Sequence, residues 1–468
     1  MARRTGRVLG TVALVLVLGA GGYAAADAYD VVPGRLTLEP APPTPAPFPT
    51  APGAIAPAPL QVVVDHLDAD APEPSADAVT ALATALAADS RLGGAAGVVV
   101  TDVLTGTTLA DVDGSTPRTP ASTTKLLTAV AAAATLDPEA TLTTEVVQAA
   151  PGTIVLVGHG DMELAPDAGD PTAVVGRAGL GDLARATARA LAASGTTQVT
   201  LVLDDTLFTG PGWNPGWHPG HNQYVAPTAA LAVDGGKTKD APYAVRYPDP
   251  ALQAATQFAA LLTAQGVTVA GPTRGTAPAG AQQLAAVESA PLRAIVAHTI
   301  RESDNTTADV LGRLVAIARG LPATYTGATQ AVVEEVGTLV DVTGVQLADC
   351  SGLADGTLIP PRVLVDLLVL ASAPGRPDLA SVVVDLPVSG WQGTLADRYT
   401  SGPARGLVRA KTGSLPNITS LAGTVLTTQG RLLAFAVIAD RTPGGQDAQR
   451  LAMDDFVAQL ATQPLPAG

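Results

Sequence analysis

The chain has 468 residues, of which 47% are hydrophobic, and it carries a formal net charge of −15. This length exceeds that of one ordinary domain, so we expect two or three domains with enough apolar residues to fill their cores. The acidic balance, without a run of Lys or Arg after the first few residues, argues against nucleic acid as a partner, because no basic surface is available to neutralise phosphates.

Residues 1–31 are typical of an export signal. Arg3, Arg4 and Arg7 precede an uncharged stretch, 8–26, that ends in small residues. This pattern predicts a signal peptide or an uncleaved membrane anchor, since the apolar stretch is about long enough to span a bilayer. In both cases we expect the rest of the chain to be exported, either secreted or associated with the membrane through its N-terminus.

Residues 32–74 are expected to form a linker. The segment is dense in Pro and Ala, a composition that favours extended polyproline-like conformations and buries little surface. The only cysteine, Cys350, cannot form an intramolecular disulfide, so an exported form of this chain must be stable without one. We interpret Cys350 as a small buried residue rather than a reactive thiol.

Predicted strands near the two ends of the folded region indicate one antiparallel sheet flanked by helices. At the N-terminal end a helix is expected at 75–88, strands at 96–102 and 107–113, and a helix from 120 to 134. At the C-terminal end strands are expected at 406–410, 418–426 and 431–439, followed by a helix at 446–461. The fold class is therefore α/β (α+β), with both chain ends contributing to the same sheet.

The middle of the chain has its own pattern and is predicted to be an inserted, smaller α/β domain. Strands are expected at 141–149, 153–158 and 199–205, with an amphipathic helix at 179–193. We expect the inserted domain and the loop that follows to cover 141–224, and the main domain to consist of 75–140 and 225–468. Further helices are expected at 251–265 and over 292–318, the latter interrupted around Ser303.

A loop rich in Pro and Gly carries three aromatic residues, Trp213, Trp217 and Tyr224, in a chain that is only 3% aromatic. Loops supported by a rigid scaffold commonly carry binding residues. Two interpretations remain open for this loop, a binding surface and a hydrophobic lid over the domain junction.

Three short motifs occur in a fixed order and together predict a serine acyltransferase site. Two of the four lysines in the chain lie in these motifs, although the chain otherwise uses Arg for most of its positive charges. Arginine could not replace them, because its guanidinium does not deprotonate and is not a compact charge. The motifs are Ser122-Thr-Thr-Lys125, Ser303-Asp-Asn305 and Lys411-Thr-Gly413.

The first two motifs supply a nucleophile and its proton acceptors. Ser122 and Lys125 are three residues apart at the start of a predicted helix, so their side chains lie on one face, and Lys125 can act as the base for the serine. This role requires a lowered pKa for Lys125, through burial or a second cation such as Lys411. Ser303 is expected to bridge the two lysines and relay the proton, and Asn305 to hydrogen-bond to the substrate backbone.

The third motif follows a predicted strand, along which an extended substrate can align. Lys411 and the Thr412 hydroxyl are expected to hold a free carboxylate, and this position is expected to keep the pKa of Lys411 above that of Lys125. Gly413 allows close backbone approach. The backbone N–H groups of Ser122 and Ser414 are expected to form an oxyanion hole. A peptide with a free C-terminal carboxylate is thus the predicted substrate.

Other catalytic sites have little support. The five histidines lack metal-ligand spacing, and no G-x-S-x-G elbow is present. We therefore expect neither a metal site nor a Ser-His-Asp hydrolase.

From about Ser75 to its end, the chain resembles the type-4, low-molecular-mass penicillin-binding proteins, which are D-alanyl-D-alanine carboxypeptidases and endopeptidases. The resemblance includes Asp349-Cys-Ser-Gly-Leu353 and the interval of 181 positions from Ser122 to Ser303, which is much shorter in β-lactamases of the related fold. Other matching segments are Phe258–Gly271, Ser289-Ala-Pro-Leu292, Leu386-Pro-Val-Ser-Gly390 and Gly393-Thr-Leu395.

The resemblance implies a penicillin-binding transpeptidase-like domain that carries an insertion. It also implies a serine D,D-peptidase that needs no cofactor and acts on peptidoglycan stem peptides. Such an enzyme lies outside the cytoplasm, faces the cell wall and is covalently inhibited by β-lactams. The activity would remove a terminal D-Ala or cut D-Ala cross-links through an acyl-enzyme on Ser122. Trp213 and Tyr224 stand where family members place aromatic residues of the stem-peptide pocket.

Two other functions, a β-lactamase and a non-catalytic cell-wall binding protein, are alternatives to the D,D-peptidase. A β-lactamase needs a base for the deacylating water, and no Glu-x-x-Leu-Asn motif appears soon after Ser303. A non-catalytic protein that binds the cell wall would be expected to have lost Lys125 or Lys411, and both are present. Preference for carboxypeptidase or endopeptidase action stays undecided by the sequence.

Overall fold

The computed structural model describes Tyr23, residues 25–27, 29 and 31–32, and the stretch 67–463. The chain divides into two units, Met1–Val64 and Asp65–Gly468. Most of the predicted signal or anchor, and the linker up to residue 66, lie outside the described residues. Within the described part of the chain, no helix has the length and hydropathy that a bilayer span requires.

The larger unit contains a five-stranded antiparallel sheet made from both of its ends. The strand order is β10-β11-β12-β1-β2, and β1 pairs with β12 so that Gly97 lies opposite Ile438. This pairing confirms the prediction of one sheet from both ends of the folded region. The strands are β1 (Gly97–Asp102), β2 (Thr108–Val112), β10 (Val408–Leu415), β11 (Ile418–Leu426) and β12 (Leu432–Ala439).

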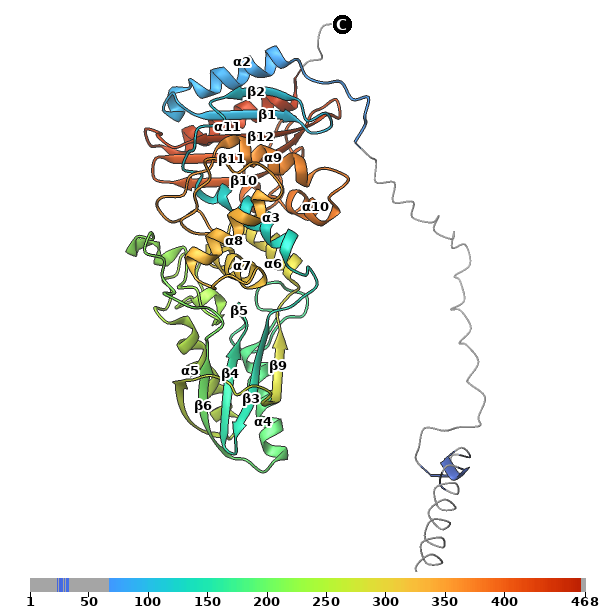
Figure 1. The fold of residues 1–468 in the computed structure, drawn as a ribbon, viewed down its shortest axis with the longest axis vertical. Helices are drawn as coiled ribbons and strands as arrows, with labels where there is room; N and C mark the ends of the chain where they lie inside the picture. Colours follow the sequence, from blue (N-terminus) through green and yellow to red (C-terminus); the bar gives the residue numbers. More distant parts are fainter. Residues whose placement is uncertain (1–22, 24, 28, 30, 33–66, 464–468) are drawn as a thin grey trace, which may run out of the picture. The chain divides into compact units, whose positions relative to one another are not determined.

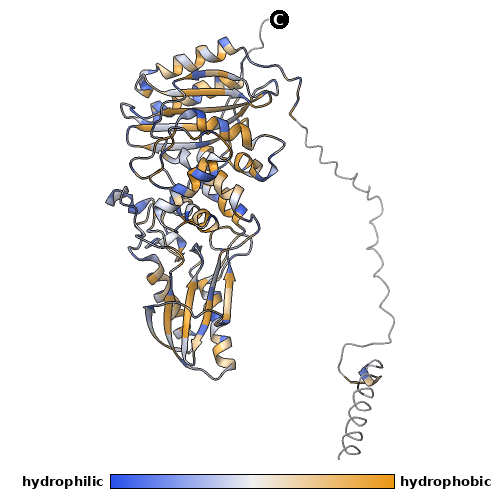
Figure 2. Ribbon diagram, in the orientation of Figure 1, coloured by the Kyte–Doolittle hydropathy of each residue, from blue (hydrophilic) through white to orange (hydrophobic). Residues whose placement is uncertain are grey.

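Both faces of this sheet are covered, as the sequence of β12 illustrates. Its residues are apolar throughout because successive side chains point to opposite faces and each face meets a hydrophobic core. Phe435 and Val437 pack on the side of α2 (Ala76–Ala87) and α11 (Gln446–Ala461). Ala436 and Ile438 pack on the opposite side, against a group of helices that includes α3 (Lys125–Thr135) and α9 (Pro361–Ala371). Figure 2 shows hydrophobic residues along these strands.

The helix that follows Ser122 is surrounded by other helices. Helix α3 (Lys125–Thr135) contacts α6, α7, α8, α9 and α10, and Figure 1 shows this helical layer between the two large sheets of the unit. Its first eight residues are all buried. The neighbouring helices are α6 (Leu292–Glu302), α7 (Asn305–Ala318), α8 (Tyr325–Gly337), α9 (Pro361–Ala371) and α10 (Pro377–Val384).

The second large sheet has the order β8-β6-β4-β3-β9 and packs against α4 (Leu180–Ala193) and α5 (Pro250–Ala264). It extends past the expected end of the inserted region at residue 224, because β9 returns to pair antiparallel with β3 and β8 pairs with β6. Its strands are β3 (Thr143–Ala150), β4 (Thr153–Gly158), β6 (Gln198–Asp204), β8 (Thr268–Arg274) and β9 (Gln282–Glu288).

Short elements connect these layers. Strands β5 (Asp161–Leu164) and β7 (Leu231–Val233) form a two-stranded parallel pair. The 3-10 turns are η1 (Ser90–Leu92), η2 (Ala121–Thr124), η3 (Pro219–Gln223), η4 (Asp234–Gly236) and η5 (Gly393–Leu395).

A buried ion pair joins the end of β1 to the start of β12. Arg431 Nη2 donates to Asp102 Oδ1 at 2.9 Å, and Arg431 Nη1 donates to the carbonyl of Ala71 at 3.0 Å. Asp102 is fully buried and Arg431 nearly so. Each group therefore depends on the other for the compensation of its lost hydration.

The variant Arg431→Met should lower the free energy of unfolding by about 3–5 kcal/mol, because it leaves Asp102 buried without its cation. Urea unfolding followed by circular dichroism measures this change. Arg293→Met is the control, because its ion pair with Glu139 is exposed (55% and 67%) and its loss should cost less than about 1 kcal/mol. Equal losses in the two variants would contradict the prediction.

Candidate active site

The first motif places a serine and a lysine side by side at the start of α3. Ser122 lies in the 3-10 turn η2, and Lys125 is the first residue of the helix that follows. Lys125 Nζ donates to Ser122 Oγ at 3.1 Å. The expected contact within one helical turn is present, although the turn around Ser122 is tighter than an α-helix.

Lys125 is fully buried and is held by two further contacts from distant parts of the chain. Its Nζ donates to Asn305 Oδ1 at 2.7 Å and to the carbonyl of Ser351 at 2.8 Å. Three acceptors therefore fix the position of the amine, and all three belong to different segments. Asn305 connects the second motif directly to the first.

Burial lowers the pKa of Lys125 to about 8, against the opposing effect of the carboxylates of Asp349, Asp304 and Asp309. An ordinary lysine is almost fully protonated at neutral pH. With a pKa near 8, a substantial fraction of Lys125 is neutral under mildly alkaline conditions. A neutral amine 3.1 Å from a hydroxyl can accept its proton.

The second motif forms a tight junction between α6 and α7. Ser303 ends α6 in the left-handed region with a φ of 60°, and Asp304 caps α7 by accepting a hydrogen bond from the N–H of Thr307 at 2.7 Å. Asp304 thus serves the helix, while Ser303 and Asn305 on either side contact the two lysines. The abrupt junction is what turns both polar side chains toward the site.

Lys411 completes the arrangement from β10. Its Nζ donates to Ser303 Oγ at 2.8 Å and to the carbonyl of Thr412 at 2.8 Å, and the residue is fully buried. Burial, and then the positive charge of Lys125, hold the pKa of Lys411 well below its ordinary value. Both lysines therefore have pKa values below that of an ordinary lysine, and the expected order of the two stays a prediction.

Gly413 allows β10 to lie close to η2. A Cβ at this position would lie 2.6 Å from the carbonyl oxygen of Pro120 and would also collide with the Ser420 hydroxyl. The missing side chain brings the strand against the turn that carries Ser122. Thr412 and Ser414 flank this contact, and the Thr412 hydroxyl donates to Thr394 Oγ1 at 2.9 Å.

Comparison with known proteins gives one consistent answer. A model of the D-Ala-D-Ala carboxypeptidase 3 (S13) family matches residues 78–241 and 237–462. A carboxypeptidase of Mycobacterium tuberculosis is 39% identical over 405 residues, which cover 83% of this chain and 84% of the relative. Carboxypeptidase DacB of Mycolicibacterium smegmatis is 35% identical over 411 residues, which cover 84% and 86%. The chain belongs to the S13 family. It is a serine D,D-peptidase.

The fold agrees with this assignment. Penicillin-binding protein 4 of Haemophilus influenzae superposes with a TM-score of 0.68 at 23% identity, covering 83% of this chain and 98% of that protein. A second structure of that protein contains a β-lactam. The resemblance and the fold class that the sequence predicted are both confirmed.

In this S13 peptidase, the aromatic loop lies beside the second and third motifs. The carbonyl of Tyr224 accepts a hydrogen bond from Asn305 Nδ2 at 3.1 Å, and its half-exposed ring packs edge-to-face on Tyr243. Trp213 packs edge-to-face on Trp217, with ring centroids 5.1 Å apart, in a cluster that also borders Leu415 of β10. Both predicted aromatic candidates are thus near the motifs.

Sequence reasoning did not assign a role to Asp349, although it is central to the site. Its buried carboxylate accepts hydrogen bonds from the backbone of residues 351–354 and from Trp217 Nε1, the latter at 2.7 Å. The resulting turn presents the Ser351 carbonyl to Lys125. Asp349, Ser351 and Gly352 lie within four consecutive residues, and such a cluster indicates a turn in the sequence. Cys350, in the same turn, is fully buried as predicted.

The variant Gly413→Ala should slow covalent labelling by a fluorescent penicillin by roughly 100-fold, because a shift of about 1 Å in a reacting group has an effect of this size. The added methyl must displace η2, and with it Ser122. Gly375→Ala is the control, because no atom lies within 4 Å of a Cβ there and its φ is not in the left-handed region. A labelling rate within twofold of wild type in Gly413→Ala would contradict the prediction.

Proposed function

We propose that Ser122 is the nucleophile that this D,D-peptidase uses on the stem peptides of peptidoglycan. The Ser122 oxygen forms a bond to the carbonyl carbon of the penultimate D-Ala, its proton passes to Lys125, and the amide C–N bond breaks. Water then hydrolyses the acyl-enzyme. The observation that carries this proposal is the contact of 3.1 Å between Ser122 Oγ and Lys125 Nζ, an amine whose pKa is lowered to about 8 by burial.

We propose that Ser303 delivers the proton to the leaving amine. Its hydroxyl contacts Lys411 Nζ at 2.8 Å, and Asn305, two residues later, contacts Lys125 Nζ. The same short segment therefore contacts both amines. A hydroxyl can accept one proton while it donates another, which suits a relay.

The substrate is proposed to lie along the second half of β10. In the described part of the chain β10 is the outermost strand of its sheet, and residues 387–389 pair only with its first half, through Val408 and Ala410. An extended peptide can pair with the strand at Thr412 and Gly413. The backbone N–H groups of Ser122 and Ser414 serve as the oxyanion hole in this arrangement.

The acyl side of the stem peptide is proposed to extend over the aromatic loop. Asn305 hydrogen-bonds to the peptide backbone, and the rings of Trp213 and Tyr224 border its side chains. The contact of Asn305 with the Tyr224 carbonyl, and the packing of Trp213 and Leu415 on one cluster, support this direction.

We propose that β-lactams acylate Ser122 as substrate mimics, as the complex of the Haemophilus influenzae relative with a β-lactam suggests. We also propose that the chain is exported and faces the cell wall, with residues 1–31 as signal peptide or anchor. The order of Arg3, Arg4 and Arg7 before an uncharged stretch supports export.

Incubation with benzylpenicillin should raise the intact mass by one ligand, and Ser122→Ala should abolish this adduct, because the strained ring opens on the serine oxygen and its amine stays tethered. Intact-protein mass spectrometry measures both forms. Ser194→Ala, at the end of the distant helix α4, should label like wild type. An adduct that persists in Ser122→Ala would reject Ser122 as the nucleophile.

The acylation rate should rise about tenfold per pH unit in the acidic range and level off above pH 8, because only the neutral form of Lys125 accepts the proton. Asp304 raises the pKa of Lys125, so Asp304→Asn should lower that pKa and move the rising limb to lower pH. At pH 6.5 the variant should therefore acylate faster than wild type.

Asparagine keeps the helix cap that Asp304 provides, so the fold of Asp304→Asn should be preserved. Asp77→Asn, an exposed first-turn residue of α2, is the matched control and should leave the pH profile unchanged. A profile that is the same in Asp304→Asn and wild type would show that Lys125 is not the group that titrates.

A further inference from the structure

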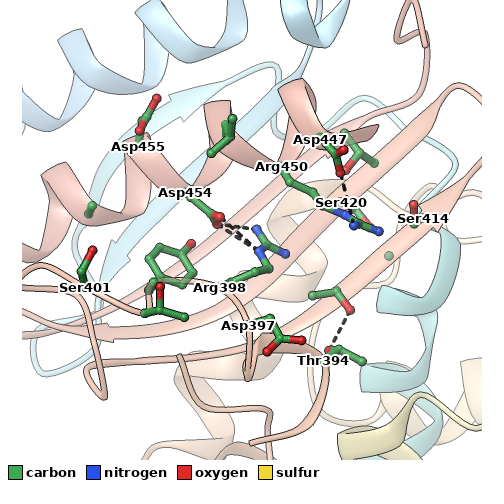
Figure 3. Close-up of a pocket in the computed structure, with 17 residues that line it drawn as sticks. Thr394, Asp397, Arg398, Ser401, Ser414, Ser420, Asp447, Arg450, Asp454 and Asp455 are labelled. Atoms are coloured by element: carbon green, nitrogen blue, oxygen red, sulfur yellow. Dashed lines mark hydrogen bonds and ion pairs between the residues drawn. The ribbon is translucent and has the colours of Figure 1, made fainter. Parts of the chain in front are cut away.

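A large cavity opens at the end of β10, next to the third motif. It has a volume of about 790 Å³ and lies between Thr412 and Ser414 of β10, the loop 394–401 and one face of α11 from Asp447 to Ala458 (Figure 3). It thus continues the strand on which the substrate is proposed to lie. The residues of the three motifs lie on the β10 side of the cavity or outside it, so the side formed by α11 has no role in the proposed function.

The substrate that this activity implies ends in a carboxylate, and Lys411 is poorly suited to bind it. The Lys411 amine is fully buried, and its contacts are Ser303 and the Thr412 carbonyl. A cation that faces the cavity is better placed, because it can keep its charge in contact with solvent.

Two arginines line the cavity, and they differ in their partners. Arg398 is bound to Asp454, its Nε lying 3.1 and 3.2 Å from the two carboxylate oxygens, and its side chain is only 14% exposed. Arg450 is 47% exposed, lies 3.8 Å from Asp447 and donates to Gln446 Oε1 at 3.3 Å. Figure 3 shows its guanidinium pointing across the cavity toward Ser414 and Ser420.

The acidic residues of the cavity do not cancel this charge. Asp454 is neutralised by Arg398, and Asp455 lies 3.6 Å from Arg91. Asp397 also lines the cavity but is exposed, so water screens its charge. Asp447, the carboxylate closest to Arg450, is 97% exposed, so water screens it strongly. A substrate carboxylate that lies between a guanidinium and hydroxyl donors forms shorter, charge-assisted hydrogen bonds.

We propose that Arg450 binds the carboxylate of the leaving residue, together with the hydroxyls of Thr412 and Ser414. This proposal rests on the proposed function, because it takes the position of the scissile bond from Ser122. Arg450 is thereby a specificity-determining residue: it selects peptides whose leaving residue carries a carboxylate next to the scissile amide nitrogen. In this arrangement Arg450 binds the carboxylate, whereas Lys125 and Lys411 take part in proton transfer.

The test compares two acyl-peptides, one ending in D-Ala-D-Ala and one ending in D-Ala-D-alaninamide, by kcat/KM with wild type and with Arg450→Ala. Wild type should prefer the free carboxylate. Arg450→Ala should lose about 10- to 100-fold on the carboxylate substrate, the range of a hydrogen bond to a charged group, and stay within twofold of wild type on the amide. Arg450→Lys should retain an intermediate preference because it keeps the charge but loses the planar fork.

Arg185→Ala is the matched control, because Arg185 also lies on a helix with an aspartate three residues before it, far from β10 in the second sheet's domain. It should leave both substrates unchanged. Equal losses on both substrates in Arg450→Ala, or an undiminished preference for the carboxylate, would overturn the proposal. If the wild type cleaved neither peptide, or if the Ser122→Ala variant still cleaved them, the proposed function itself would fail. These results differ from those that would overturn only the role of Arg450.

Discussion

The geometry of the candidate active site depends on the burial of one lysine amine. Lys125 lies beneath the surface of the helical layer, where its ammonium loses its hydration and must be compensated by Ser122, Asn305 and the Ser351 carbonyl. These partners come from η2, from α7 and from the turn after Asp349. A buried charge without partners is costly, so these three segments must all contact the Lys125 amine. The geometry of the candidate site is therefore set by the same packing that forms the core.

The turn that follows Asp349 links this point to the substrate surface. The Asp349 carboxylate holds the turn through four backbone N–H groups and also accepts from the indole of Trp217. Trp217 in turn contacts Trp213 and Tyr325 edge-to-face. The aromatic loop is therefore anchored to the same carboxylate that positions the Ser351 carbonyl, which accepts a hydrogen bond from Lys125. This chain of contacts gives the loop a structural role, with which the proposed role in substrate binding is compatible.

Two buried amines in the candidate site are consistent with the division of tasks that we propose. The positive charge of Lys125 disfavours a second charge on Lys411, which lowers the pKa of Lys411. Amines in this state are suited to accept and return protons through Ser122 and Ser303. They are less suited to hold a carboxylate that keeps its charge throughout the reaction. An exposed guanidinium has the opposite properties, since it stays charged at every physiological pH.

The sequence by itself determined the chemistry and the local geometry. The spacing of Ser122 and Lys125 was sufficient to place them in contact, because three residues make one turn of a helix. The largely apolar run 431–439 and the other strands expected near both ends of the folded region predicted the first sheet, and the structure confirms it. Export, by contrast, follows from residues 1–31 and stays a prediction, since most of them lie outside the described residues.

Only the tertiary structure decided how the motifs combine. The contact of Lys411 with Ser303 spans 108 residues, and that of Lys125 with Ser351 spans 226, so neither distance is encoded in local spacing. The same applies to β8, whose residues are largely exposed and show no alternation of burial, so that its place in the second sheet follows from pairing with β6. The lowered pKa of Lys411 and the place of Arg450 beside β10 likewise arise from packing, because desolvation and charge proximity depend on which distant elements meet.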